Sequence, residues 1–102
     1  MTARILYTPD AVADLGELGE YLQAEAGPRV AAKWIRKLRA TIRLLGEQPL
    51  VGRADDELGP GRRRIADRPY VIVYEVQGTT VRIVRVLDGR RDLPKVMARW
   101  DL

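Results

Sequence analysis

The sequence predicts an α+β fold in which a short N-terminal strand precedes a helical hairpin and an antiparallel β-sheet. In residues 9–47, apolar side chains recur every three or four positions, as in amphipathic helices. Residues 70–87 are instead rich in β-branched and aromatic side chains on both sides of a Gly-Thr turn. Helices and strands are therefore segregated along the chain, which is typical of α+β domains.

The composition of the chain limits the number of domains and the kinds of chemical site that it can contain. The chain has 102 residues, 46% hydrophobic and 31% charged, so we expect one globular domain over residues 1–102. It contains no cysteine and no histidine, which removes disulfides, thiolate metal sites and the usual general base at neutral pH. We therefore expect no metal and no other cofactor. No apolar run approaches the roughly 20 residues that span a bilayer, and the first residues do not resemble a signal peptide. These features predict a cytoplasmic protein that does not contact membranes.

The first elements are a strand and a capped helix. Residues 4–7 are suited to a short strand, and Thr8 and Pro9 are suited to the N-cap and the first helical position that follow. Acidic residues occupy the outer side of this helix. Its predicted apolar stripe consists of Val12, Leu15, Leu18 and Leu22.

A second helix is predicted from Gly27-Pro28 to about residue 47, before Gln48-Pro49, which completes an αα-hairpin. We interpret the pair as solvated amphipathic helices rather than as a functional basic helix, because exposed ion pairs are weak and common. Trp34 is expected in the core. The apolar arc comprises Val30, Trp34, Ile35, Leu38, Ile42 and Leu45, and the remainder carries Lys33, Arg36, Lys37, Arg39 and Arg43.

The C-terminal half is predicted to be the sheet. Residues 49–61 are rich in Gly, Pro and Asp and indicate a surface loop, followed by strands over residues 62–66, 70–76 and 80–87. A two-residue turn would pair Val76 with Val81, Tyr74 with Ile83, Ile72 with Arg85 and Tyr70 with Leu87. Both faces of this hairpin are largely apolar, so we expect the helices to cover one of them. The other face, hypothesised to carry Tyr70, Tyr74 and Arg85, is then a candidate docking surface.

Positive charge is concentrated in the same half. Residues 1–60 carry 8 basic and 9 acidic side chains, whereas residues 61–102 carry 10 basic and 5 acidic ones. The segment after the last strand turns at Gly89 and is expected to end in one helical turn. An anionic partner, either nucleic acid or an acidic protein segment, is therefore expected on the C-terminal half.

Two segments carry a resemblance to a known family. Residues 70–76 read Tyr-Val-Ile-Val-Tyr-Glu-Val, and residues 85–92 read Arg-Val-Leu-Asp-Gly-Arg-Arg-Asp. Together with the basic strand before them, they resemble the RelE/ParE toxin superfamily over nearly the whole chain. This resemblance implies a toxin of a type II toxin-antitoxin module that is neutralised by a cognate antitoxin. The RelE-like branch cuts messenger RNA on the ribosome without a metal, and the ParE-like branch is associated with poisoning DNA gyrase.

The resemblance also implies which residues would cleave RNA. Arg62, Arg64 and Arg91 match basic positions of the RelE-like set. Val71 stands where that pattern has an arginine, and Met97 is the nearest equivalent of its tyrosine or histidine in the tail. Cleavage by 2′-hydroxyl attack needs proton transfer as well as cations, and arginines supply only the cations. The resemblance therefore favours a ParE-like toxin, ahead of a RelE-like ribonuclease and of an inactive antitoxin-binding relative.

Several residues are expected to contact the antitoxin or the target. The basic residues 62–64 fit either a charge-protected edge strand or an anion-binding strip. Arg85 fits either an ion pair with Asp88 or Asp92 or a shared patch with its basic neighbours. The full expected set is Arg62, Arg64, Tyr70, Tyr74, Arg85, Arg90, Arg91 and Trp100.

Overall fold

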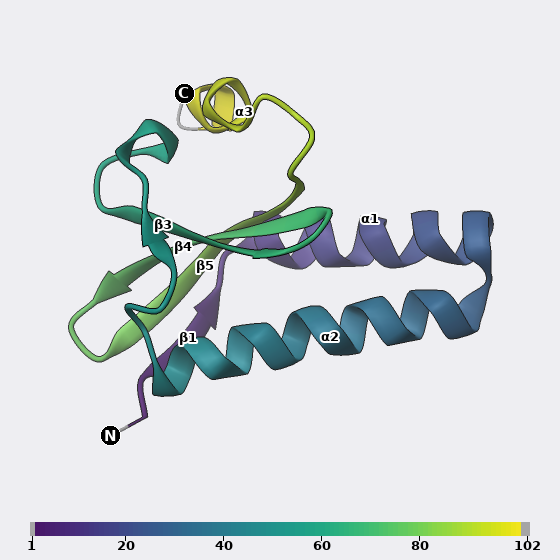
Figure 1. The fold of residues 1–102 in the computed structure, drawn as a ribbon, viewed down its shortest axis with the longest axis horizontal. Coiled ribbons are helices and arrows are strands. Elements are labelled where there is room, and N and C mark those ends of the chain that lie inside the picture. Colours follow the sequence, from purple (N-terminus) through teal and green to yellow (C-terminus); the bar gives the residue numbers. More distant parts are fainter. Residues whose placement is uncertain (1, 101–102) are drawn as a thin grey trace.

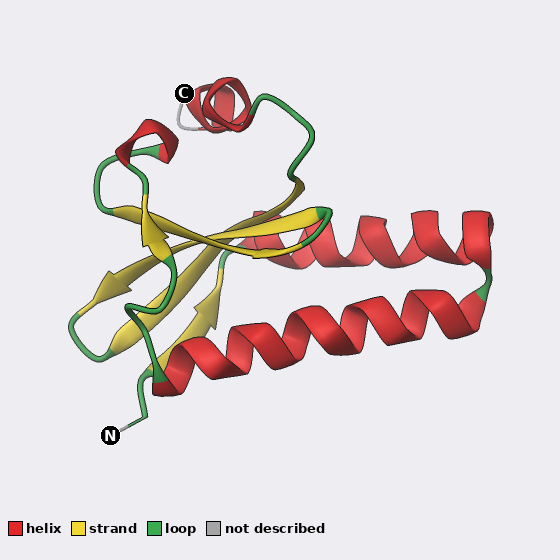
Figure 2. Cartoon of the chain, in the orientation of Figure 1, coloured by secondary structure: helices red, strands yellow, loops and turns green. Residues whose placement is uncertain are grey.

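A five-stranded sheet lies at the centre of the computed structural model, which describes residues 2–100 (Figure 1). The strand order is β1-β5-β4-β3-β2, with β1 parallel to β5 and the other neighbours antiparallel. The α+β class and the order of elements are confirmed (Figure 2), and the parallel β1 makes the sheet mixed. In chain order the elements are β1 (Arg4–Tyr7), α1 (Pro9–Ala26), α2 (Pro28–Glu47), β2 (Arg53–Ala54), the 3₁₀ helix η1 (Asp56–Leu58), β3 (Arg62–Asp67), β4 (Tyr70–Gln77), β5 (Thr80–Asp88) and α3 (Leu93–Trp100).

The helical hairpin begins and turns where the sequence predicts. The Thr8 hydroxyl accepts the Ala11 N–H at 3.0 Å and donates to the Val84 carbonyl at 2.7 Å, so the N-cap also ties α1 to β5. Gly27, at φ 93°, separates the two helices, and Pro28 opens α2. None of the helices in residues 2–100 is long and apolar enough to cross a bilayer.

The apolar stripe of α1 differs from the prediction at its first position. Val12 is 58% exposed, whereas Ala11 is completely buried against the sheet. The early part of α1 therefore turns a smaller residue inward, where the helix lies close to β5. Val30 is also exposed, because the connected ends of the two helices extend past the sheet (Figure 1).

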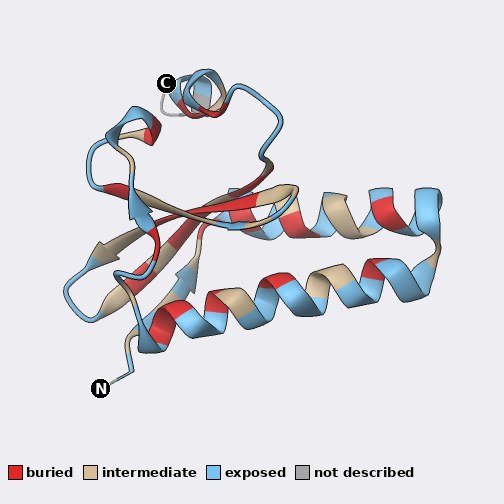
Figure 3. Ribbon diagram, in the orientation of Figure 1, coloured by how far each residue is buried: buried red, intermediate tan, exposed pale blue. Residues whose placement is uncertain are grey.

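The main core lies between the helical hairpin and one face of the sheet. Figure 3 shows the buried stretches of α1 and α2 turned toward the strands. Tyr74 is fully buried here, its hydroxyl donating to the Pro49 carbonyl at 2.8 Å and accepting the Gly52 N–H at 2.8 Å. The buried residues of this cluster are Ala11, Leu15, Leu38, Ile42, Leu45, Ile72, Tyr74, Val81, Ile83 and Val86.

A second, smaller core lies on the opposite face of the sheet. It is covered by α3 and η1, and α3 spans eight residues rather than the single turn expected from the sequence. The cluster consists of Leu58, Val71, Val73, Val84, Leu87, Leu93 and Met97. Both faces of the sheet therefore have an apolar core, but the second cover is much shorter than the first.

The β4–β5 pairing contains a bulge that the predicted register lacks. The predicted pairs Val76–Val81 and Tyr74–Ile83 are confirmed, and Val73 then pairs with Arg85. The predicted pairs Ile72–Arg85 and Tyr70–Leu87 are wrong, since the partners are Val86 and Asp88 respectively. The extra residue reverses the alternation of β5, because a one-residue slip moves side chains to the opposite face.

Candidate functional site

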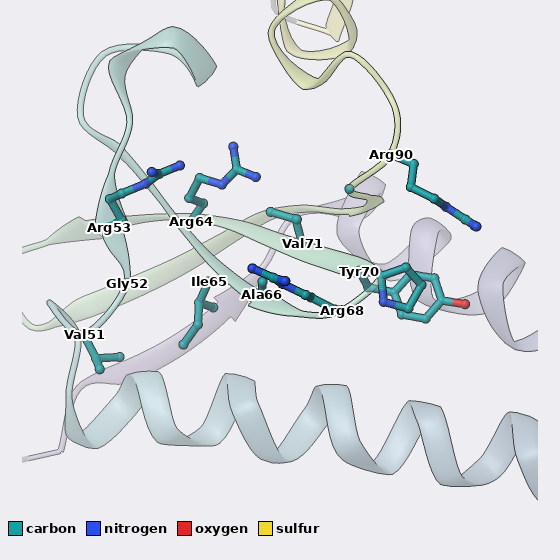
Figure 4. A pocket seen from close by; sticks show the side chains of 12 residues that line it. Val51, Gly52, Arg53, Arg64, Ile65, Ala66, Arg68, Tyr70, Val71 and Arg90 are labelled. Atoms are coloured by element: carbon teal, nitrogen blue, oxygen red, sulfur yellow. The ribbon is translucent and has the colours of Figure 1, made fainter.

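A hollow of about 790 Å³ opens beside the short α3 cover, along the end of β3 (Figure 4). Arginines line it together with small or apolar residues that include Ala66, Val71 and Gly89. We call this site the basic hollow and define it by the arginines Arg53, Arg64, Arg68 and Arg90.

Four separate segments supply these arginines. Arg53 lies on β2, Arg64 on β3, Arg68 in the turn between β3 and β4, and Arg90 in the segment after β5. Figure 4 shows Arg53 and Arg64 together at one end, Arg90 at the other, and Arg68 between them. The site is therefore assembled by tertiary contacts and not by one continuous motif.

Gly89 brings the segment after β5 against the β3–β4 turn. Its N–H donates to the Pro69 carbonyl at 2.7 Å. A Cβ at this position would lie 2.9 Å from a Val71 methyl and 3.0 Å from the Pro69 oxygen, so only glycine allows this approach. The contact holds Arg90 at the rim of the basic hollow.

The four arginines differ in how far their charge is neutralised. Arg64 lies 3.3 Å from the Asp55 carboxylate, and Arg90 lies 2.6 Å from that of Asp88. Arg53 and Arg68 are exposed and have no ion pair with any residue in the described part of the chain. These two side chains are the cations best placed to bind an incoming anion.

The acidic and phenolic groups at the rim are poorly suited to proton transfer. Hydrogen bonds from the Arg90 side chain and backbone lower the pKa of Asp88 to about 2. Burial, followed by the nearby charge of Asp88, raises the pKa of Tyr70 above its ordinary value of 10.0. At neutral pH the first group is a very weak base, and the second stays protonated.

The three arginines of the ribonuclease pattern do not meet. Arg64 lines the basic hollow. Arg62 is buried, donates to the Leu58 carbonyl at 2.9 Å and lies 3.6 Å from Glu75, so its expected place on an open surface is wrong. Arg91 is exposed on a neighbouring surface beside α1 and α3.

The tyrosines and the tail also differ from the expected docking surface. Tyr74 is 0% exposed, so its expected surface position is wrong, and the helical hairpin covers the face proposed for docking. Tyr70 is half-buried and lines the basic hollow, with its ring 5.2 Å from that of Trp34 in an edge-to-face contact. The Trp100 side chain lies outside the described residues.

Arg85 has a partner that the sequence did not indicate. Its guanidinium donates two hydrogen bonds to Asp14 of α1, at 2.7 and 2.8 Å, and the Val86 N–H donates to the same carboxylate at 2.9 Å. The expected pairing with Asp88 or Asp92 is therefore wrong. The bulge sets Arg85 opposite Val73 instead of Ile72, and the acid that its guanidinium contacts is Asp14 of α1 rather than an acid near the end of β5.

Sequence reasoning missed Arg53 and Arg68. Arg53 stands in a loop-like stretch, and Arg68 precedes the proline of the β3–β4 turn, so neither belongs to a periodic pattern. The available signal was the Arg-Pro turn itself, which places residue 68 at the end of a hairpin beside Tyr70.

Comparison with known proteins gives the chain a family. A family model described as the ParE toxin of the type II toxin-antitoxin system parDE matches residues 5–93. Toxin ParE1 of Caulobacter vibrioides is 40% identical over 77 residues, which cover 76% of this chain and 79% of that protein. Toxin ParE1 of Mycobacterium tuberculosis is 33% identical over 96 residues, covering 93% of this chain and 98% of its own length.

Solved structures with lower identity show the same fold. A chain of the chromosomal ParDE system from P. aeruginosa has a TM-score of 0.73 at 23% identity, covering 83% of this chain and 94% of that one. A mutant of the E. coli toxin RelE in its free state has a TM-score of 0.68 at 16% identity, covering 100% of this chain and 99% of that one. The family-model match and the curated relatives both support the same assignment: this chain belongs to the ParE toxin family of type II toxin-antitoxin systems.

Proposed function

We propose that this chain arrests bacterial growth by poisoning DNA gyrase in the cytoplasm, and that a cognate antitoxin neutralises it. The observation that carries this proposal is the dispersal of the ribonuclease set. Arg62 is turned into the protein against Leu58 and Glu75, and Arg91 lies on a different surface from Arg64. This geometry favours action by binding over cleavage of a phosphodiester bond.

The chemistry of the basic hollow also favours binding over cleavage of RNA. Attack by a ribose 2′-hydroxyl needs a group that takes its proton and another that protonates the leaving oxygen. Asp88, with a pKa of about 2, is poorly matched to the first task. The position equivalent to the tail tyrosine or histidine is Met97, which is buried in the second core. Arginines beside small and apolar side chains are better suited to a protein interface, where arginine is enriched.

The antitoxin is proposed on the basis of the family. Chains of this family are described as parts of a two-component module, and solved relatives of the same fold include toxin-antitoxin complexes. An acidic segment that binds across Arg53 and Arg68 would neutralise the two arginines of the basic hollow that have no ion pair within the described residues.

The first experiment is induction of the chain alone in bacteria, with and without its antitoxin. We expect growth arrest, a DNA damage response and intact messenger RNA, and recovery when the antitoxin is co-expressed. Cut messages at ribosomes without a damage response would instead support a RelE-like ribonuclease. Normal growth at confirmed expression would indicate an inactive antitoxin-binding relative.

A purified assay tests which surface makes the contact. Gyrase and supercoiled plasmid are incubated with the chain, and cleaved DNA complexes are counted. Arg53→Glu with Arg68→Glu should lower the potency by at least about tenfold, because like charges at an interface cost several kcal/mol. The matched control Arg4→Glu with Arg39→Glu reverses two exposed cations outside the basic hollow. Equal losses in both variants would rule out the basic hollow as the contact surface.

A further inference from the structure

The outer side of α2 carries a second, separate group of cations. Arg29, Lys33, Arg36 and Arg43 are all exposed, and the side of α2 turned away from the sheet is exposed along its length (Figure 3). At 3.6 residues per turn they fall within an arc of about 80°, and at 1.5 Å per residue they span about 21 Å. We call these four residues the cationic stripe.

The charge of the cationic stripe is not neutralised within the described protein. None of its four residues forms an ion pair or a side-chain hydrogen bond with another residue in positions 2–100. The only acidic residue of α2 is Glu47, at its last position. Lys37, on the flank of the same helix, instead lies 4.8 Å from the Trp34 ring and is left out of the stripe.

Several arginines of the sheet and its flanking segments behave differently from the stripe. Five arginines of the C-terminal half are each in an ion pair within the fold. Their acidic partners come from α1, the flank of η1, β4 and β5. These paired arginines are Arg62, Arg64, Arg82, Arg85 and Arg90. Unpaired positive charge on a rigid helix therefore requires a partner outside the chain or has only a general electrostatic role.

We propose that the cationic stripe binds the phosphate backbone of double-helical DNA. A duplex presents one negative charge per roughly 1.7 Å of its axis, so a straight stripe of about 21 Å meets a dense, rigid row of phosphates. Exposed Ala40 lies on the same arc between Arg36 and Arg43, and its small side chain lets the duplex approach the helix.

Other anionic partners fit the stripe less well. Single-stranded nucleic acid is usually held by aromatic side chains on which bases stack. The stripe has no aromatic member, and Trp34 on the same helix is engaged with Tyr70 and Lys37. Acidic protein segments in stable interfaces bury apolar anchors among the charges. Within the arc of the stripe, Ala40 is the only apolar residue of α2 that could serve as such an anchor.

The test measures binding of the purified full chain to a fluorescently labelled DNA duplex by anisotropy, across a series of salt concentrations. The variant Lys33→Gln/Arg36→Gln/Arg43→Gln keeps good helix formers on α2 and removes three charges. We expect its slope of log affinity against log salt to fall by about 3, because each lost phosphate contact removes roughly 0.9. At low salt it should bind at least about tenfold more weakly than the unaltered chain.

The matched control Arg4→Gln/Lys95→Gln/Arg99→Gln removes the same number of exposed charges from β1 and α3. It should keep most of the salt slope and affinity. Equal losses in the two variants would overturn the proposal in favour of a general effect of net charge. Tighter binding of a single strand, or of a polyglutamate peptide, than of the duplex would overturn it in favour of those partners. The assay contains no gyrase, so its outcome is independent of the proposed toxicity.

Discussion

Neighbouring residues on β4 point to opposite faces of the sheet and have different surroundings. Ile72 is covered by the helical hairpin, whose helices are 18 and 20 residues long. Val71 points to the face that the eight-residue α3 covers only in part, and it lines the basic hollow. The difference shows that the length of the covering helix decides which apolar face of this sheet keeps an accessible site.

The largest expected effect compares these two neighbours directly. Ile72→Ala should lower the free energy of unfolding by about 2–5 kcal/mol, since it leaves a cavity in a closed core. Val71→Ala should cost only about 1–2 kcal/mol, because water in the basic hollow can occupy the lost volume. Urea denaturation of both variants measures the difference. Equal losses would mean that the two faces are equally closed in solution.

The next effect concerns the ion pair that joins the hairpin to the sheet. Asp14→Ala leaves Arg85 and the Val86 N–H without their shared acceptor, in a partly buried place. We expect a loss of about 2–3 kcal/mol, below the roughly 3–5 kcal/mol of a fully buried pair. Glu25→Ala, at an exposed position of the same helix, is the control and should stay within about 0.5 kcal/mol. A thermal melt that does not separate the two variants would contradict the role given to Asp14.

A pair of glycine substitutions tests the packing of Tyr74 under the hairpin. A Cβ at Gly52 would lie 2.7 Å from the Tyr74 ring and 2.8 Å from the Arg64 carbonyl, so Gly52→Ala should destabilise by about 1–3 kcal/mol. A Cβ at Gly16 on α1 would meet no atom within 4 Å beyond its chain neighbours and the backbone of its own helix, so Gly16→Ala should stabilise by about 0.5–1 kcal/mol. Chemical denaturation measures whether each substitution lowers or raises the free energy of unfolding. A Gly52→Ala variant with unchanged stability would show that Tyr74 can move aside.

The smallest effect is the pH dependence of the Asp88–Arg90 pair at the rim of the basic hollow. Asp88 has a folded pKa of about 2, below its ordinary value of 3.8. Its contribution to stability is therefore fully present above about pH 4 and is lost as the pH falls through about 2. Asp88→Asn should flatten the acid unfolding curve slightly in this window, because the pair is exposed and screened. An unchanged curve would show that the pair does not persist in solution.

Local features of the sequence predicted the elements well because their signals are local. Thr8 and Pro9 cap a helix within a few residues, and Gly27-Pro28 separates two helices regardless of what packs on them. The Gly-Thr turn likewise set the first pairs of the β4–β5 hairpin, ending at Tyr74–Ile83. Beyond that point the bulge changed the register, and no residue in the sequence marks it.

The sequence by itself determined the α+β order of elements, the basic C-terminal half and the segments that resemble the toxin superfamily. Tertiary structure decided which arginines are accessible. The Arg62 side chain is buried because it contacts the Leu58 carbonyl and Glu75. Arg53 and Arg68 come from separate segments and line the same hollow. The physical reason is that helix caps and turns depend on near neighbours, while burial and charge pairing depend on contacts between residues far apart in the chain.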